Sequence, residues 1–287
     1  NQPISVGPPF FDLTFVPLMA ACLLIVPAGP LLTWKRADLW GAVQRLWTAA
    51  LLAVIAGGAV LALKSPRSIP VALGVALGAW LVAGALVEIA ERVRIGRAPM
   101  AEVGRRLKGL PRGAWGMTLA HGALGLFVLG ACFESTFKLN TAQSLSLGGA
   151  ERLGAYVLKL DRVGALQGPN FDAERALVEV DRNGREICLA APERRLYEPG
   201  GQTTSDVAIC QQGLDDIYVV LGDRRPDANG ARAWVVRGFF NPWARLIFFG
   251  PILMGLGGLI SLSDRRLRFA AGRRAVPVAS PALGPAE

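Results

Sequence analysis

The stretch Ala114-Trp-Gly-Met-Thr-Leu-Ala-His-Gly-Ala-Leu-Gly-Leu-Phe-Val-Leu-Gly-Ala-Cys-Phe133 contains twenty residues, and His121 is its one side chain that titrates near neutral pH. About 20 apolar residues cross the hydrocarbon core of a bilayer as a helix that rises about 1.5 Å per residue. Four other runs have a similar length and character: Leu13–Leu32, Leu46–Leu63, Ile69–Val87 and Leu246–Leu262. We therefore predict a polytopic α-helical membrane protein with five spans.

The composition of the whole chain agrees with this fold class. Its 287 residues are 52% hydrophobic and 18% charged, and the mean hydropathy is +0.37. Soluble globular domains carry about 25% charged residues. A disordered chain, a collagen-like chain and a purely soluble enzyme are excluded.

The net charge of +9 is distributed unevenly. Residues 33–45, 91–114 and 264–287 together hold a basic surplus of ten, whereas residues 136–242 contain 13 basic and 14 acidic side chains. Because basic loops stay on the cytoplasmic side, the pattern predicts an N-terminus outside and a C-terminus inside. The basic residues are expected at membrane lipid headgroups, and no nucleic acid is predicted as a partner.

The same pattern predicts the domain organisation. Residues 1–135 form a membrane bundle of four spans, residues 136–242 an extracytoplasmic domain, and residues 243–263 the fifth span. Residues 264–287 are expected to be a basic, disordered cytoplasmic tail because they are rich in Ala and Pro.

Residues 136–242 are expected to be an inserted all-β domain. Tyr156–Asp161 alternates apolar and polar side chains, as does Ala176–Asp181. The pair Asn183-Gly184 then supplies the two positive φ values of a type I′ hairpin turn before a further strand. With more candidates at residues 216–221 and 232–239, the region predicts a small sandwich or barrel.

The common soluble catalytic signatures are missing. The sequence has no glycine-rich phosphate loop after a strand and no H-E-x-x-H, C-x-x-C or G-x-S-x-G motif. Of the four cysteines, Cys188 and Cys210 fall in the β domain, where an oxidising compartment would permit a disulfide. Two small buried thiols are the alternative, and the spacing leaves both open.

His121 is the candidate functional residue. An ionisable group inside a span is costly unless it faces a cavity, a partner or a cofactor, and Gly122 and Gly125 would let a flat ligand or another helix come close. A neutral imidazole is the usual axial ligand of b-type haem, and a low-spin site needs two such ligands. The alternative is a histidine that forms a hydrogen bond in a packing seam of small residues.

Two segments with charged side chains give less specific predictions than His121. Glu88 and Glu91 end the third span and are expected to be an interfacial cap paired with Arg92 or Arg94 rather than a proton relay. The Glu193–Tyr197 segment, with two arginines, is either a clamp for a carboxylate such as a haem propionate or a solvated strand face.

Several motifs resemble, in order, the C-terminal part of the CcmF family of cytochrome c haem lyase subunits. The resemblance covers about residues 4–268. Its motifs are Ser5-Val-Gly-Pro-Pro-Phe-Phe-Asp12, Gly29-Pro-Leu-Leu-Thr-Trp-Lys-Arg36, Leu119-Ala-His-Gly122, Leu166-Gln-Gly-Pro-Asn170, Glu193-Arg-Arg-Leu-Tyr197 and Asn241-Pro-Trp243.

The resemblance implies a bacterial inner-membrane subunit of the system I cytochrome c maturation machinery, with its β domain in the periplasm. Such a subunit takes haem from holo-CcmE and, with CcmH and CcmI, attaches it to apocytochrome c. The family carries a b-type haem within the membrane, and the resemblance implies that His121 is one of its two axial ligands, with Gly122 and Gly125 beside it.

The resemblance also implies that the tryptophan-rich WWD segment and the second axial histidine belong to an N-terminal CcmF half. This sequence is then a fragment or the product of a split gene, and it is not expected to be active alone. The alternative is a membrane-anchored extracytoplasmic binding or sensor subunit without haem. A transporter is disfavoured, because repeated halves are not visible.

Overall fold

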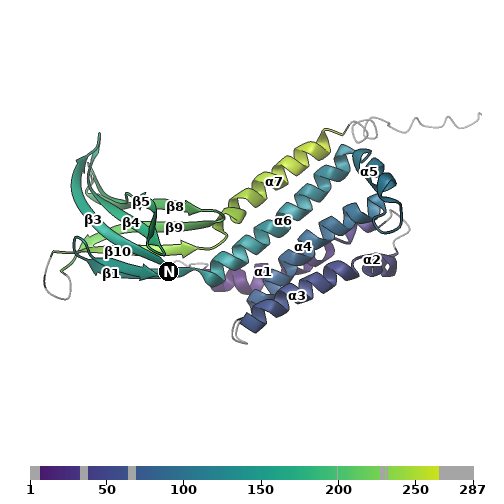
Figure 1. The fold of residues 1–287 in the computed structure, drawn as a ribbon, viewed down its shortest axis with the longest axis horizontal. Coiled ribbons are helices and arrows are strands. Elements are labelled where there is room, and N and C mark those ends of the chain that lie inside the picture. Colours follow the sequence, from purple (N-terminus) through teal and green to yellow (C-terminus); the bar gives the residue numbers. More distant parts are fainter. Residues whose placement is uncertain are drawn as a thin grey trace, which may run out of the picture.

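A computed structural model describes residues 7–32, 38–63, 69–198, 200–226, 230 and 232–264 of the chain. It consists of a helical bundle joined end to end with a β sandwich (Figure 1). The helices are α1 (Pro8–Ile25), the 3-10 helix η1 (Gly29–Leu31), α2 (Leu39–Arg45), α3 (Trp47–Leu63), α4 (Ile69–Val93), α5 (Met100–Lys108), α6 (Arg112–Phe137) and α7 (Ala244–Leu262).

The apolar runs of the sequence are helical. Four segments of the described residues are long and apolar enough to cross a membrane: Phe10–Leu31, Ile69–Val93, Arg112–Phe137 and Ala244–Leu262. The remaining predicted span corresponds to α3, which is apolar but has 17 residues. The first predicted span is interrupted, since α1 ends at Ile25 and Pro27, which has no N–H to donate, follows.

The loops between the spans differ from the sequence prediction at one place. Within the basic segment 91–114, the chain forms the short helix α5, whose Glu102 pairs with Arg106 at 2.6 Å. Residues 265–287 of the predicted tail lie outside the described part of the chain.

Helix α6 lies between α4 and α7, and glycines bring the three backbones together. A Cβ atom added at Gly125 would lie 2.8 Å from the backbone nitrogen of Val82 in α4. On the opposite side, a Cβ at Gly250 of α7 would lie 3.1 Å from the carbonyl oxygen of Ala123. Small residues at contact points are the usual means of helix packing in membranes, so the sequence pattern of the spans accounts for this core.

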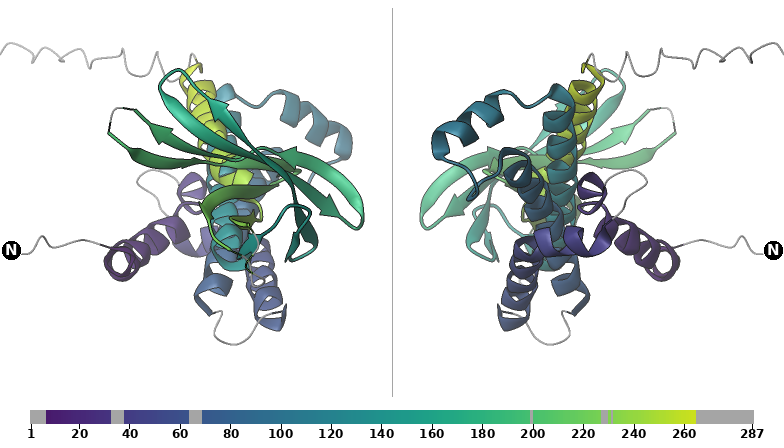
Figure 2. Two further views of the ribbon diagram at one scale, coloured as in Figure 1. Left: turned by 90° about the vertical axis from the view of Figure 1, so that its left-hand side faces the viewer. Right: turned by 90° about the vertical axis from the view of Figure 1, so that its right-hand side faces the viewer.

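Helix α1 lies at the edge of the bundle (Figure 2). Its end is held to α4 by the indole N–H of Trp80, which donates to the carbonyl oxygen of Leu24 at 3.0 Å. The N–H of Ala28, which would be the helical donor to that carbonyl, donates instead to the carbonyl oxygen of Ile25 at 3.0 Å, so the indole satisfies a group that has lost its helical partner.

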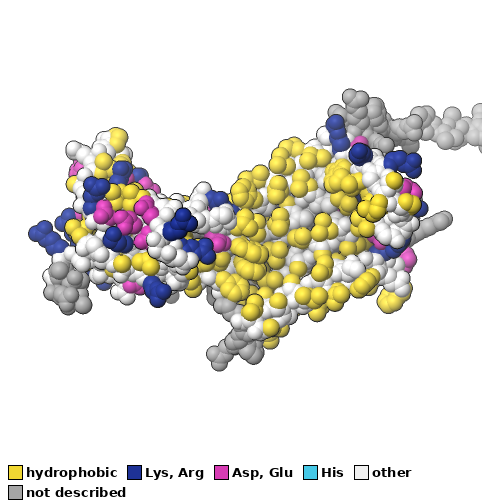
Figure 3. Space-filling view, in the orientation of Figure 1, with side chains coloured by type: hydrophobic (Ala, Val, Ile, Leu, Met, Phe, Trp, Pro, Cys, Tyr) yellow, Lys and Arg dark blue, Asp and Glu magenta, His cyan; other side chains and the backbone are white. Residues whose placement is uncertain are grey.

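Apolar side chains cover the outside of the bundle. Leu18, Val54, Leu86 and Leu259 are each more than 60% exposed. Figure 3 shows this apolar band between the charged surface of the β sandwich and the charged side chains near α5. A soluble surface does not carry an apolar patch of this extent, whereas a membrane protein does.

The β sandwich contains two antiparallel sheets. One has the strand order β1-β10-β9-β8, and the other has the order β2-β3-β4-β6-β7 with β5 also paired to β4. The strands are β1 (Leu139–Leu145), β2 (Ala150–Leu153), β3 (Tyr156–Gln167), β4 (Phe171–Arg182), β5 (Arg185–Ala190), β6 (Glu193–Tyr197), β7 (Gln202–Asp206), β8 (Ala208–Gln212), β9 (Asp215–Arg224) and β10 (Trp234–Asn241).

The predicted hairpin is confirmed between β4 and β5. Asn183 and Gly184 have φ values of +53° and +76°, as a type I′ turn requires. The alternating strands turn their apolar faces into a core shared by both sheets, in which Leu158, Val178 and Ile217 are fully buried.

Cys188 and Cys210 are joined by a disulfide, with their Cα atoms 6.2 Å apart. Cys188 lies on β5 and Cys210 on β8, so the bond connects one sheet to the other. Of the two states that the sequence left open, the structure has the bonded one.

The sandwich is inserted between α6 and α7. Helix α6 leads directly into β1, β10 leads into α7, and Leu139 pairs with Phe240 where the two strands leave the helices. Trp243 begins α7 with a positive φ of 56° and stacks on Phe133 of α6 with ring centroids 3.9 Å apart. Its backbone N–H donates to Oδ1 of Asp215 at 2.9 Å, which anchors the junction to β9.

Candidate functional site

His121 lies in the middle part of α6, half-buried, on the side of the helix that borders α4. It makes no hydrogen bond with the described residues of the chain. The carboxylate of Glu88, on α4, acts electrostatically on its imidazole. The ring nitrogens are therefore available to a partner outside these residues.

The two glycines beside His121 differ in their surroundings. At Gly125 the space that a side chain would take is filled by α4, with the carbonyl oxygen of Gly78 2.9 Å from a Cβ atom placed there. At Gly122 such an atom would make an ordinary contact of 3.7 Å with Ala85. The close approach at Gly125 is thus made by a helix, and contact of either glycine with haem stays a prediction.

Glu88 is the buried acid of the bundle. Its side chain is 2% exposed, and Oε1 accepts hydrogen bonds from Arg92 at 2.9 Å, as the sequence predicted for this pair. Its other oxygen, Oε2, is buried and has no hydrogen-bond partner in the part of the chain that the structure describes. Glu91 instead pairs with Arg97 at 3.0 Å near the surface.

A second unpaired oxygen lies on α6. Oγ1 of Thr118, one turn before His121, is buried and has no hydrogen-bond partner within residues 7–32, 38–63, 69–198, 200–226, 230 and 232–264. Thr118 lines an apolar cavity of about 310 Å³ between α4, α6 and α7, and Gly122 and Leu253 also contribute to its walls. His121 is not among the residues that line this cavity.

These surroundings would suit an axial haem ligand, and ligation of haem by His121 stays a prediction. The imidazole is unpaired and lies among apolar helices, and a buried carboxylate oxygen nearby lacks a donor. Metal-bound histidines usually donate their second ring N–H to such an acceptor. Since the chain has one histidine, a second imidazole ligand would come from outside it.

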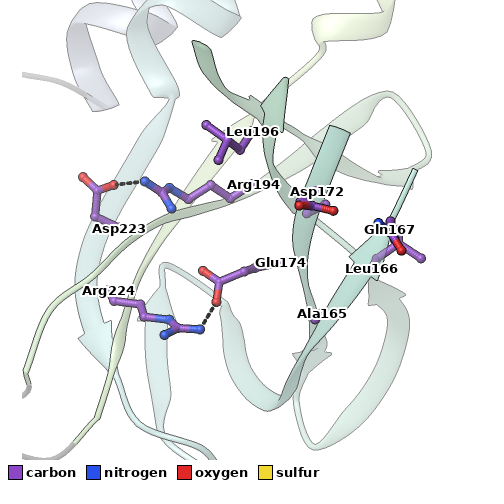
Figure 4. A pocket seen from close by; sticks show the side chains of 10 residues that line it. Ala165, Leu166, Gln167, Asp172, Glu174, Arg194, Leu196, Asp223 and Arg224 are labelled. Atoms are coloured by element: carbon purple, nitrogen blue, oxygen red, sulfur yellow. Dashed lines mark hydrogen bonds and ion pairs between the residues drawn. The ribbon is translucent and has the colours of Figure 1, made fainter. Parts of the chain in front are cut away.

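The β sandwich carries an open polar cleft of about 880 Å³, with walls from β3, β4, β6 and β9 (Figure 4). Two ion pairs cross it between the sheets: Arg194 with Asp223 at 2.9 Å, and Arg224 with Glu174. The figure shows both pairs reaching across the opening. The sequence analysis missed this cleft, because its walls join strands far apart in the chain.

Buried Glu193 lies beside the cleft and is bracketed by two arginines. Its oxygens pair with Arg175 and, at 2.7 Å, with Arg195, which also pairs with Asp206. Arg195 lies over the ring of Phe171, 4.7 Å from its centroid. The arginines that the sequence suggested as a carboxylate clamp are therefore occupied by acids of the same domain.

We expect the sandwich to lose stability in acid through Glu193. Burial raises the pKa of this carboxyl, but hydrogen bonds from Arg195 and Arg175 outweigh burial and hold the pKa below the usual 4.5. A lowered pKa stabilises the folded state above pH 4.5, and that contribution is lost as the pH falls through the lowered value. The unfolding temperature should change little between pH 7 and 5 and fall below pH 4.5.

A Glu193→Gln variant serves as the control for this pH dependence. It should be less stable at pH 7 and show a flatter acid limb when thermal unfolding is followed by circular dichroism. Equal acid limbs in the variant and the wild type would assign the acid sensitivity to other carboxylates.

Comparison with known proteins places these observations in a family. The profile of the CcmF C-terminal beta-sandwich matches residues 136–242. The cytochrome c-type biogenesis protein CycK of Bradyrhizobium diazoefficiens is 38% identical over 95% of the chain and 41% of its own length. The CcmF protein of Pseudomonas aeruginosa is 33% identical over 92% of the chain and 39% of its own length.

A solved structure has the same fold. The cytochrome c haem lyase CcmF matches with a TM-score of 0.68 and 23% identity, over 90% of this chain and 41% of that one. The chain thus spans about two fifths of the length of the relatives it matches. With the sandwich family, the relatives and the shared fold in agreement, this membrane protein belongs to the CcmF family of cytochrome c-type biogenesis proteins and corresponds to its C-terminal part.

Proposed function

We propose that this chain supplies His121 as one axial ligand of a transmembrane b-type haem in a cytochrome c haem lyase. The observation that carries the proposal is an unpaired imidazole among apolar helices, next to a buried carboxylate. An intramembrane ionisable residue is retained where it has a use, and iron ligation is a use that this environment permits. The second axial ligand would come from the N-terminal CcmF half.

The chain's own residues would then hold and shield the ligand. Helix α6 is fixed by close glycine contacts with α4 and α7, so the position of His121 along the bundle is well defined. The bound haem would supply one-electron transfer, which keeps the substrate haem reduced for attachment. The apolar side chains around α6 would keep water from the site.

The location that we propose is the bacterial inner membrane, with five spans and the β sandwich in the periplasm. The apolar band, the basic surplus of residues 33–45, 91–114 and 264–287 in the sequence and the disulfide in the sandwich support this orientation. Disulfides persist in the periplasm and are rare in the cytosol.

The partners that we propose are the N-terminal CcmF half, CcmH, CcmI, holo-CcmE as haem donor and apocytochrome c. The β sandwich is the part of this chain that would reach them at the periplasmic face. Its open cleft with two crossing ion pairs supports a role in docking.

A complementation experiment tests the proposed function. A bacterium lacking its own CcmF would receive the N-terminal part of a relative such as CycK together with this chain, and holocytochrome c would be measured by haem stain. We expect holocytochrome with the pair and none with either part alone. No holocytochrome from a pair that assembles would count against the proposal.

A second variant tests the role of the β sandwich by removing it. Residues 139–240 would be replaced by a short Gly/Ser linker, which can span the gap because Leu139 and Phe240 are paired neighbours. We expect loss of holocytochrome while α6 and α7 still insert. An unchanged yield and unchanged partner capture would remove docking from the proposed function.

A further inference from the structure

Oε2 of Glu88 is a buried carboxyl oxygen without a hydrogen-bond partner among the described residues. The side chain is 2% exposed, and both contacts from Arg92 go to Oε1. An unsatisfied buried carboxylate oxygen costs free energy, since it has lost water and gained no donor. The structure therefore holds an acceptor that a group outside the described contacts can satisfy.

The register of the two helices places Glu88 level with the turn of α6 that holds His121. Helices α4 and α6 are antiparallel at their contact, where Gly125 meets Val82 and Gly122 meets Ala85. Glu88 lies one turn after Ala85 on α4. Because the helices are antiparallel, the part of α6 at the same level precedes Gly122, and it contains His121 and Thr118. The electrostatic interaction between Glu88 and His121 agrees with this register.

We propose that Glu88 is a positioning residue for the axial ligand, with Oε2 accepting the hydrogen bond of the His121 ring N–H that faces away from the iron. The inference rests on the proposed function of His121. No hydrogen bond joins the two side chains in this structure, so the bond forms when the imidazole turns one nitrogen to the metal. Such outer partners fix the tautomer and raise the basicity of the ligand.

Arg92 has a part in the same arrangement. By holding Oε1 with two donors, it fixes the plane of the carboxylate and leaves Oε2 free for a single acceptor role.

The test uses this chain assembled with the N-terminal part of a relative and purified with its haem. Glu88→Gln keeps the size of the side chain and removes its charge. We expect haem affinity to fall about 10- to 100-fold, as for other outer-shell partners, and the midpoint potential of the remaining haem to rise. Low-spin ferric EPR should show altered g values, because the imidazole is less electron-rich.

Two further variants separate positioning from packing. Glu91→Gln makes the same change one turn along α4, where the acid pairs with Arg97 near the surface, and should match the wild type. Glu88→Asp keeps the carboxylate and should restore haem content toward the wild-type level. A loss in Glu88→Asp equal to that in Glu88→Gln would overturn the proposal in favour of packing.

The outcomes also distinguish this inference from the proposed function. An unchanged potential and haem content in Glu88→Gln, with haem that still depends on His121, would overturn the role of Glu88 alone. Haem that persists in His121→Ala would overturn the ligand assignment and, with it, this inference.

Discussion

Replacing His121 with alanine is expected to remove the b-type haem spectrum of the protein assembled with its N-terminal partner. An axial ligand bonds the iron directly, so its loss leaves a five-coordinate or empty site, whereas loss of a packing side chain leaves the absorption bands in place. Reduced and oxidised visible spectra in detergent, normalised to protein, measure the change. We expect haem content to fall by at least about tenfold, as for loss of a partner that tunes metal binding.

The control for this experiment is Met117→Ala, a change of an apolar side chain one turn earlier on α6. It should keep the spectrum of the wild type. An unchanged spectrum in His121→Ala would move the ligand elsewhere. Absence of haem from the wild-type assembly would favour the anchored binding module without haem.

The second large effect is expected from removing the disulfide of the sandwich. Replacing Cys188 and Cys210 with alanine removes a covalent bond between residues 22 positions apart. By limiting the conformations of the unfolded chain, such a bond contributes about 3 kcal/mol to the free energy of unfolding. The bond also joins the two sheets, so its removal is expected to destabilise the sandwich as a whole. A fall of about 12–24 °C in the unfolding temperature of the sandwich follows from about 4–8 °C per kcal/mol for a domain of this size.

Calorimetry or protease resistance of the purified chain measures this loss. Treating the wild type with a reductant should reproduce it, and Cys22→Ala, which removes an exposed free thiol, should not. An unfolding temperature within about 2 °C of the wild type in the double variant would show that packing between the sheets suffices, since that corresponds to a fraction of a kcal/mol.

Helices and the main hairpin could be predicted from local signals. Apolar runs of 17 to 26 residues have few alternatives in a membrane, and Asn183-Gly184 fixes a turn by its own backbone preference. Strands β6, β7 and β8 have five residues each, which is too short for an alternating apolar pattern to stand out in the sequence, although β7 pairs with its neighbour β6 and β8 with its neighbour β9.

In the candidate site, too, one residue could be predicted from the local sequence and another could not. His121 stands out in the sequence because it is an isolated titratable group in an apolar run. Glu88 was expected at an interface because it lies near the end of a run, but α4 continues to Val93 and the acid is buried. Its burial depends on the register of two helices, which only the fold reveals.

The pairing of β1 with β10 bears on how the hairpin of α6 and α7 assembles. A flexible connection of about a hundred residues would cost roughly 4 kcal/mol in closure entropy before the two helices could meet. Once folded, the sandwich brings both helix ends to neighbouring strands and acts as a rigid, tight turn. The folded sandwich therefore lowers the entropic cost of docking α7 on α6, and unfolding of the sandwich would restore that cost.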